Sequence, residues 1–579
     1  MKIKKMMFTL LVFITILYIS ACNNITLTEN EYDVIVVGTD PEGIAAAIST
    51  SRNGLNTLLI DDRDKVGGLF TLGWLNFLDM NYGPNNELLT RGIFEEFYSN
   101  IEGIAFDVQT AEEVFNNMIQ NEDNITLSLS HSSISPIMED NKLIGIESFK
   151  SEDKYISYAK YIIDATQDGD IAAKSGASYT LGQADIGGPS HGMAVTQVFK
   201  LGGIKNDNWQ EIRSYLKNDG DINTGSTYNT AWGFPELYRS YNAQNDSVQM
   251  RGLNIARQSD GCVMINALQI FYIDPLDSES LSSAKEIASN ELELIIPFLQ
   301  KNIPGMQNIT LLKTAPELYV RESRHFDTLY RVTVDDVLEH RNFEDKIALG
   351  SYPVDLQGTF PGDDVIILGN PKIYSIPLRA TIPKDTKNLF IASRSAGYDS
   401  LAHGSIRVVP VGMCVAEGVG QAVSMLVNEN ISIDELITSE ARIDALQDDL
   451  ISFGAYLPDF DYPPEIINHK HYKGLRFVRK YGLVQGRYNN NYKLDKTISA
   501  VEFAEKFNYL NSHLKWSYSE LEVENDALLT KNLLQNMVIS EQKLINHLKL
   551  IDFYSIISNH QELSNGEAYM LLYHIGLIN

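Results

Sequence analysis

A glycine-rich turn near the start of the chain has the residues and the spacing needed to hold a diphosphate. Gly38, Asp40 and Gly43 occupy the three positions of a G-x-G-x-x-G pattern, and an acid, Asp61, follows the last glycine. The first glycine allows a tight turn, the third lets a helix pack closely, and the N-terminus of that helix attracts anions. The later acid can accept hydrogen bonds from ribose hydroxyls. These residues predict a dinucleotide site.

Asp40 departs from this pattern, because the middle position is normally glycine. A side chain there restricts the approach of the backbone to the diphosphate, and a carboxylate repels it unless it points away. The same fold without a nucleotide is therefore the alternative that this motif leaves open.

The segments around the turn have the order that such a site requires. Residues 32–37 are an apolar run typical of a buried parallel strand, and residues 44–53 read as a helix that Gly54 ends. Residues 57–60 form a second short strand that leads to the acid. Strand, glycine turn, helix, strand and acid together predict a Rossmann-type domain.

Further segments resemble the bacterial FAD-dependent oxidoreductases of the glutathione-reductase-like superfamily, relatives of the heterodisulfide reductase flavoproteins. The matching segments are the pair Gly67-Gly68, the DAT-x-DGD run at 164–170, and residues 318–324, 335–338, 346–353, 374–379, 388–394 and 403–412. The resemblance covers about residues 32–425, and this ordered series is more specific than any single motif. It implies FAD as the cofactor and a small molecule as the substrate.

The resemblance also implies which residues contact FAD. Besides the four residues named first, we expect contacts from Gly67, Gly68, Thr71, Asp164, Ala165, Thr166, Asp168, Gly404, Ser405, Arg407 and Gly412.

No acid or base is fixed by spacing alone, so the catalytic candidates follow from position in the matched segments. His403 is the candidate proton donor or acceptor, with a hydrogen-bonded core histidine as the alternative. Arg321 and Arg324 are candidates to hold a carboxylate or phosphate. Their alternative is an internal ion pair with Glu322, Asp335 or Asp336. We take His403 and Arg324 as the catalytic pair and predict no metal ligands.

The first 22 residues carry an export signal. Three lysines precede an apolar stretch that is shorter than a comfortable membrane span, and residues 19–22 (Ile-Ser-Ala-Cys) resemble a bacterial lipobox. The resemblance implies lipidation of Cys22 after removal of residues 1–21, with 22–31 as a polar tether. An uncleaved signal anchor is the alternative. We therefore expect an extracytoplasmic protein that is lipid-anchored to the bacterial cell membrane.

Charge and cysteine content exclude other classes. The chain has 47 basic and 75 acidic residues, a net charge of −28, which becomes about −31 once the three lysines of residues 1–21 are removed. Such a charge argues against binding nucleic acid. Only Cys262 and Cys414 remain besides Cys22, too few for a four-cysteine iron–sulfur cluster. An NAD(P)H-dependent enzyme stays open, although a second glycine-rich fingerprint does not occur.

We expect an α/β fold with a Rossmann-type FAD-binding domain formed by residues 32–180, which include a β-meander, and 386–428. An α+β substrate domain is inserted at 181–385. Prolines mark a linker at 429–466, and a mainly helical domain at 467–579 follows, with an amphipathic helix over 519–550.

The helical domain resembles one S-layer-homology repeat at about 471–504, with a fainter half-copy at 563–568. This implies cell-wall polysaccharide as a partner. However, Ala500 and Asn565 stand where that family has a basic residue, so a domain that only packs on the catalytic body is the alternative.

Two functions remain. The first is a cell-envelope FAD-dependent oxidoreductase that transfers hydride between an unidentified small molecule and the flavin. The second is a non-catalytic envelope binding protein on a flavoprotein scaffold, which Asp40 favours.

Overall fold

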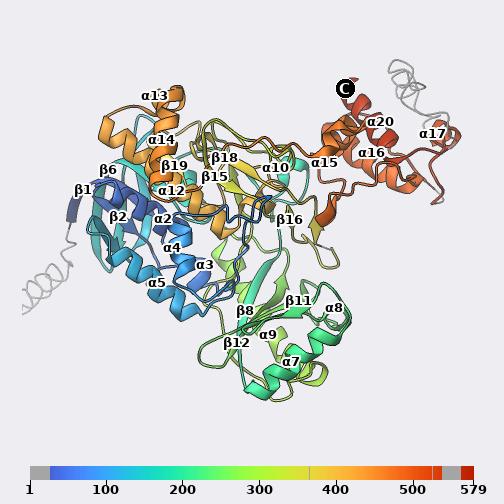
Figure 1. Ribbon diagram of the computed structural model, residues 1–579, viewed down its shortest axis with the longest axis horizontal. Helices are drawn as coiled ribbons and strands as arrows, with labels where there is room; N and C mark the ends of the chain where they lie inside the picture. Colours follow the sequence, from blue (N-terminus) through green and yellow to red (C-terminus); the bar gives the residue numbers. More distant parts are fainter. Residues whose placement is uncertain (1–26, 364, 524–525, 538–561, 579) are drawn as a thin grey trace, which may run out of the picture.

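A parallel sheet forms the larger of two layered units in the computed structural model, which describes residues 27–578 except 364, 524–525 and 538–561 (Figure 1). Its strand order is β3-β2-β1-β6-β5-β4, with β19 also paired to β6. The parallel strands are β1 (Leu27–Val37), β2 (Thr57–Ile60), β3 (Ile125–Ser128), β6 (Asp153–Asp164) and β19 (Leu389–Ile391). The antiparallel β4 (Ser132–Glu139) and β5 (Lys142–Lys150) extend the sheet beyond β6 and form the expected meander.

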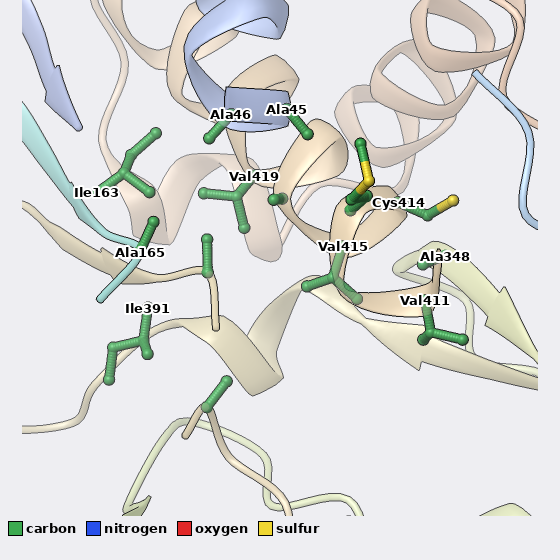
Figure 2. Packing of buried hydrophobic residues seen from close by; sticks show 14 of the residues in the cluster. Ala45, Ala46, Ile163, Ala165, Ala348, Ile391, Val411, Cys414, Val415 and Val419 are labelled. Carbon is green, nitrogen blue, oxygen red and sulfur yellow. The ribbon is translucent and has the colours of Figure 1, made fainter. Parts of the chain in front are cut away.

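Two helices with small side chains pack against each other on this sheet. Helix α2 (Pro41–Arg52) follows the glycine turn, and α12 (Val409–Glu429) returns to it from far along the chain. Figure 2 shows Ala45 and Ala46 of α2 beside Val419 of α12, with Ile163 of β6 nearby. The small side chains allow the two helices to pack closely. The start of α2 and the start of α12 lie together at one edge of the sheet.

Helix α12 is the one described helix that is long and apolar enough to span a membrane. However, 89% of its most apolar window is buried inside the protein, which identifies it as a core helix.

The second unit is a six-stranded sheet with the order β13-β8-β12-β11-β10-β9 (Figure 1). The strands are β8 (Val195–Gly202), β9 (Gly225–Ser226), β10 (Thr230–Gly233), β11 (Val248–Arg257), β12 (Val263–Ile270) and β13 (Thr310–Thr314), all paired antiparallel. Helices α7 (Asn206–Asn218) and α9 (Ser278–Asn302) complete a core around Phe199, Trp209 and Leu292. This core is narrower than the predicted 181–385, because Phe326, Val332 and Ile376 pack into the larger core instead.

Further helices and short strands complete the two units. They are α3 (Gly68–Thr71), α4 (Ile93–Ser99), α5 (Val108–Gln120), α6 (Asp170–Lys174), β7 (Tyr179–Leu181), α8 (Pro235–Ser240), β14 (Arg324–Phe326), α10 (Val334–Leu338), β15 (Lys346–Gly350), β16 (Asp355–Leu356), β17 (Ile366–Ile367), β18 (Tyr374–Pro377) and α11 (His403–Ile406).

Two predicted connecting segments are parts of the folded body. Strand β1 begins at Leu27, which pairs with Lys154 of β6, so residues 27–31 of the expected tether 22–31 belong to the sheet. The expected linker 429–466 contains α13 (Ile433–Ile437) and α14 (Glu440–Ser452), whose Leu436 and Leu446 are buried in the larger core. Cys22 and the predicted signal peptide lie outside the described residues.

The C-terminal region is helical, as predicted, and has its own small core. It contains α15 (Tyr472–Arg479), α16 (Ala500–Leu514), α17 (Lys531–Met537) and α20 (Asn565–Ile578). Only α17 falls within the predicted helix 519–550: residues 519–523 and 526–530 are not helical, and 538–550 lie outside the described residues. The region meets the larger unit where α15 lies beside α10 (Figure 1).

Candidate active site at the glycine turn and a buried histidine–arginine cluster

The turn between β1 and α2 has the close packing that a diphosphate site needs. Gly38 has φ +103°, which side chains rarely adopt. A Cβ on Gly43 would lie 1.9 Å from the Gly38 carbonyl oxygen and 3.1 Å from the Cβ of Ala165. Both glycines and the small Ala165 are therefore required for the helix to start so close to the sheet.

Asp40 is the N-cap residue of α2 and is fully buried. Its side chain does not cap α2, and Oδ1 instead accepts a hydrogen bond of 2.8 Å from the amide of Leu69. A Cβ on Gly68 would lie 2.0 Å from that oxygen. The carboxylate thus lies against the glycine pair of α3 and does not cap the first turn of α2.

Arg63 neutralises this carboxylate and links it to a distant segment. Its guanidinium lies 2.6 Å from Asp40 Oδ2, 3.6 Å from Asp61 Oδ2 and 2.7 Å from Glu317 Oε1. Asp61 also accepts hydrogen bonds from the amide and the hydroxyl of Thr39. Burial alone would raise the pKa of Asp61, but Arg63 and these hydrogen bonds hold it below its usual value. A ribose contact by Asp61 remains a prediction, since the acid already binds the turn.

A cavity of about 270 Å³ lies beside these groups. Its lining includes Asp40, Arg63, Gln167, Asp168 and Arg394. Arg394 donates 2.6 Å to Asp168 Oδ1 and 2.8 Å to Gln167 Oε1, so the side of the cavity opposite Arg63 carries a second ion pair. The DAT-x-DGD run and the strand-end Arg394 are therefore brought together with the glycine turn.

Asp164, in contrast, is used inside its own loop. Its carboxylate accepts hydrogen bonds from Ala172 N and from the amide and hydroxyl of Thr166. Burial raises the pKa of Asp164 to about 6. Asp164 and Thr166 shape the turn from β6 into α6. Direct contact with FAD remains a prediction for both residues.

Glu42 is a second buried carboxyl group at the start of α2. It accepts a hydrogen bond of 2.9 Å from Gln167, and a Cβ on Gly412 would lie 2.6 Å from it. Burial and the neighbouring Asp40 raise the pKa of Glu42 to about 8. Gly412 is therefore required by the approach of Glu42 to α12.

His403 begins α11 and is 1% exposed. Its ring stands perpendicular to that of His325 at 4.8 Å, and His325 Nε2 lies 3.1 Å from Glu322 Oε1. Neither ring nitrogen of His403 has a hydrogen-bond partner among the described residues, and His325 Nδ1 also has none. Burial, followed by His325, Arg407 and Arg394, lowers the pKa of His403 well below its usual value, so the imidazole is neutral at physiological pH.

Two arginines contact one tyrosine, and Arg407, one of the two, also acts on His403. Arg407, at the C-terminal end of α11, donates 2.8 Å to the hydroxyl of Tyr319. The guanidinium of Arg321 stacks over the Tyr319 ring at 4.2 Å from its centre. Both arginine side chains are almost completely buried.

Arg324 lies outside this cluster, and its catalytic role remains a prediction. It forms an ion pair of 2.8 Å with Asp170 and donates to the carbonyl of Asp168. The acids expected as its partners are bound elsewhere, Asp335 by Arg479 and Asp336 by Arg341. Arg324 therefore holds the DGD loop.

The remaining predicted residues serve packing or local hydrogen bonds. The hydroxyl of Ser405 donates to the carbonyl of Tyr352 and lies 2.7 Å from the Tyr374 hydroxyl. Thr71 donates 2.6 Å to the carbonyl of Val66, and a Cβ on Gly404 would lie 2.9 Å from the Asp355 carbonyl oxygen. Gly67 has φ +93° at the start of α3. Contact of these groups with FAD is not tested by the geometry.

Three residues of the site were missed by sequence reasoning. Glu42 lies within the fingerprint, Arg63 follows Asp61 by two positions, and His325 directly follows the matched run that ends at Arg324. A charged residue at such a position in a predicted turn could have indicated that it belongs to the site.

The fold and the glycine turn together define a dinucleotide-dependent oxidoreductase. The chain belongs to the FAD dependent oxidoreductase family, whose sequence profile matches residues 33–450. It is an enzyme of that family, and its cofactor is FAD. The close packing of the glycine turn fits the dinucleotide, whereas the charge of the buried Asp40 opposes it.

Individual known proteins that the chain resembles share little sequence with it. A 3-oxosteroid 1-dehydrogenase of Mycolicibacterium smegmatis is 28% identical over 116 residues, and this match spans 19% of either chain. A geranylgeranyl bacteriochlorophyll reductase-like protein from Thermoplasma acidophilum is 11% identical, with a TM-score of 0.37 over 84% of this chain and 99% of that one. A myxobacterial chondrochloren halogenase is also 11% identical, with a TM-score of 0.37 over 95% and 97% of the two chains.

Proposed function

We propose that this FAD-dependent oxidoreductase acts at the bacterial cell envelope and transfers hydride between a small molecule and the flavin. FAD, when bound, supplies the group that exchanges the hydride. The observation that carries the proposal is the buried His403, whose two ring nitrogens have no partner within the described residues. A buried polar group without a partner is costly, and active sites are where such groups are retained.

The neighbours of His403 fit a proton relay. A neutral imidazole can take a proton from a substrate hydroxyl or carbon acid. Glu322 accepts the Nε2 hydrogen of His325 in the tautomer that this contact requires, which leaves His325 Nδ1 as an acceptor close to His403. Because burial, followed by His325, Arg407 and Arg394, disfavours a positive His403, a proton taken there would pass on to the Glu322 carboxylate through His325.

Glu322, His325 and His403 also place ligand atoms within 4.8 Å of one another, a spacing that a metal ion could use. Two observations favour the relay instead. Both Glu322 oxygens already accept hydrogen bonds, from His325 and from the amide of Met193. The two nearby arginines raise the electrostatic cost of adding a cation.

The catalytic part is tested by flavin reduction. The purified protein is mixed anaerobically with a panel of alcohols, amines and hydroxy acids, and bleaching of the flavin is followed by stopped flow. We expect His403→Asn to retain FAD but to slow reduction by about 10²–10⁴-fold, the range for loss of a general base. His574→Asn, on the remote helix α20, is the control. An unchanged rate in the His403 variant would remove His403 from the mechanism.

The envelope part has separate support. The C-terminal region contains a cavity of about 350 Å³ whose lining includes Arg487, Lys493, Lys496 and Lys506. Glu502 is the one acid in the lining, and it pairs with Lys506 at 3.2 Å. Such a basic pocket in a chain of net charge −28 favours an anionic partner. We therefore propose that this region binds cell-wall polysaccharide while Cys22 carries the lipid anchor.

Both envelope claims have direct tests. Labelling of cells with a fatty-acid probe should mark the protein, and Cys22→Ser should abolish the label. Cosedimentation with purified cell-wall sacculi should fall at least tenfold in a Lys493→Ala, Lys496→Ala double variant but not in Lys142→Ala, which lies on the exposed meander. Equal sedimentation of both variants would leave the region as a packing domain only.

A further inference from the structure

Starting from the proposed oxidoreductase function, we infer that the substrate is a small carboxylate, which Arg321 and Arg407 bind beside His403. The inference deepens the proposed function by naming a substrate class, and it depends on the charge balance of the buried arginines.

Arg321 is a buried cation without an acid. Its Nη1 donates to the Ala194 carbonyl and the Thr196 hydroxyl, both at 2.8 Å, whereas Nη2 has no hydrogen-bond partner. The residue is 1% exposed and forms no ion pair with a described acid. Burial lowers the pKa of Arg321 to about 9; Arg251 and Arg407 act in the same direction, while Tyr319 and the more distant Asp355 oppose them. A charge held in this way is unfavourable until an anion reaches it.

Other arginines around the cofactor cavity do not share this property. Arg63, Arg324 and Arg394 each have a carboxylate oxygen within 2.8 Å. Arg407 is intermediate, because its nearest carboxylate, that of Asp355, is 3.9 Å away and its Nε has no partner. Asp355 and Asp79 act on Arg407 and raise its pKa, so the positive charge without an adjacent acid is concentrated at Arg321.

Tyr319 fixes the two guanidinium groups relative to each other. Its ring lies under Arg321, and its hydroxyl accepts from Arg407, so neither arginine can turn away without losing a contact. His403 and Arg407 lie at opposite ends of the single turn of α11, and the Arg407 amide donates to the His403 carbonyl. An anion held by Arg407 is therefore one helical turn away from His403.

A carboxylate suits these donors better than a neutral group does. Its two oxygens match the fork of a guanidinium, and charge-assisted hydrogen bonds are about twice as strong as neutral ones. A neutral alcohol or amide would leave the Arg321 charge unbalanced.

The test uses the FAD-loaded protein and paired probes. Lactate, glycolate and succinate are titrated against their neutral amides, and binding is followed by the perturbation of the flavin absorption spectrum and by the shift in Tm. We expect the carboxylates to bind at least tenfold more tightly than the amides. Arg321→Met and Arg407→Gln should each remove at least tenfold of that preference, and Arg257→Met, on the far strand β11, should not.

Two outcomes would overturn the inference. Equal binding of acids and amides by the wild-type protein would exclude a carboxylate site. A shift of the flavin midpoint potential in Arg321→Met with carboxylate binding unchanged would assign the charge to the flavin itself. Should Arg321→Met fail to fold, Arg321→Lys retains the charge without the fork and should show weakened but measurable selectivity. Failure of the proposed function is distinct, because it would appear as a protein that takes up no FAD or whose flavin no donor reduces.

Discussion

The guanidinium of Arg63 lies 2.6 Å from the carboxylate of Asp40, so the diphosphate turn holds an acid together with the cation that neutralises it. Arg63 also binds Glu317, which is 254 positions away and lies on the side of the second sheet. The turn is thereby tied across the cavity before any cofactor arrives.

Replacing Asp40 should strengthen FAD binding. In Asp40→Gly the repulsion of the diphosphate is lost and Arg63 becomes available to it; two charges 4 Å apart interact by about 1–4 kcal/mol at the dielectric constants of water and protein surfaces. We expect the Kd for FAD to fall at least tenfold, measured by quenching of flavin fluorescence. Asp33→Asn, a solvent-side acid on β1, is the control. An unchanged or raised Kd would show that Asp40 does not oppose the cofactor.

Glu42 should make stability depend on pH. Because burial raises its folded-state pKa from 4.5 to about 8, the folded protein binds more protons than the unfolded chain between these values. Stability therefore decreases as pH rises through this window. Glu42→Gln should equal the wild type at pH 4.5 and exceed it by up to about 4 kcal/mol at pH 8.5. Chemical denaturation at both pH values measures this, with the exposed Glu211→Gln as control. If the stability of the wild type and of Glu42→Gln changed equally between the two pH values, Glu42 would not be protonated in the folded protein.

Arg479 should hold the C-terminal region to the body. It is fully buried on α15 and pairs with Asp335 of α10 at 2.6 Å. Removing one partner of a buried pair costs about 3–5 kcal/mol, and we expect the lower end of this range because Arg476 still contacts Asp335 at 3.1 Å. Arg479→Met should release the C-terminal region to limited proteolysis and lower Tm. Arg476 contacts the same carboxylate from a half-exposed position. Arg476→Gln should therefore lower the free energy of unfolding by less than about 1 kcal/mol. Equal resistance of both variants would contradict this anchoring role.

Gly43 should be intolerant of any side chain. An added methyl would lie 1.9 Å from the Gly38 carbonyl oxygen, so the turn must open. Overpacking in a core costs about 1–3 kcal/mol and more where backbone must move. We expect Gly43→Ala to lose FAD and at least about 3 kcal/mol of stability in urea. Gly252→Ala, whose added methyl finds no atom closer than 3.5 Å, should stay near the wild type. A soluble, FAD-loaded Gly43→Ala protein would contradict the packing.

The sequence predicts the fold best where local signals are strong. The apolar run 32–37, the glycines and the Ala-rich start of α2 each specify their own conformation, and β2, β19 and α12 follow the same logic. Strand β1 starts five residues earlier than its apolar run, because the polar residues 27–31 gain their order only from pairing with β6. Helices α13 and α14 were not predicted, because the prolines that follow them indicated a linker.

The site is harder to predict because its key relationships connect distant segments. Arg321 and Arg324 are three positions apart, and sequence cannot show which one faces the core and which one meets Asp170. The pairing of Arg63 with both Asp40 and Glu317 depends on how the two sheets are arranged. His403 could be chosen from its place in a matched segment, but His325 becomes visible only when the two rings meet.

The early start of β1 also limits where an anchored enzyme can work. Leu27 is already paired into the sheet, so only residues 23–26 separate it from Cys22. Since an extended residue spans at most about 3.6 Å, an acyl chain on Cys22 would keep this end of the sheet within about 18 Å of the lipid surface. Such a short tether would restrict the orientation of an anchored enzyme as well as its distance from the bilayer. Its reach would be confined to a thin shell over the bilayer, and substrates would have to diffuse to it there.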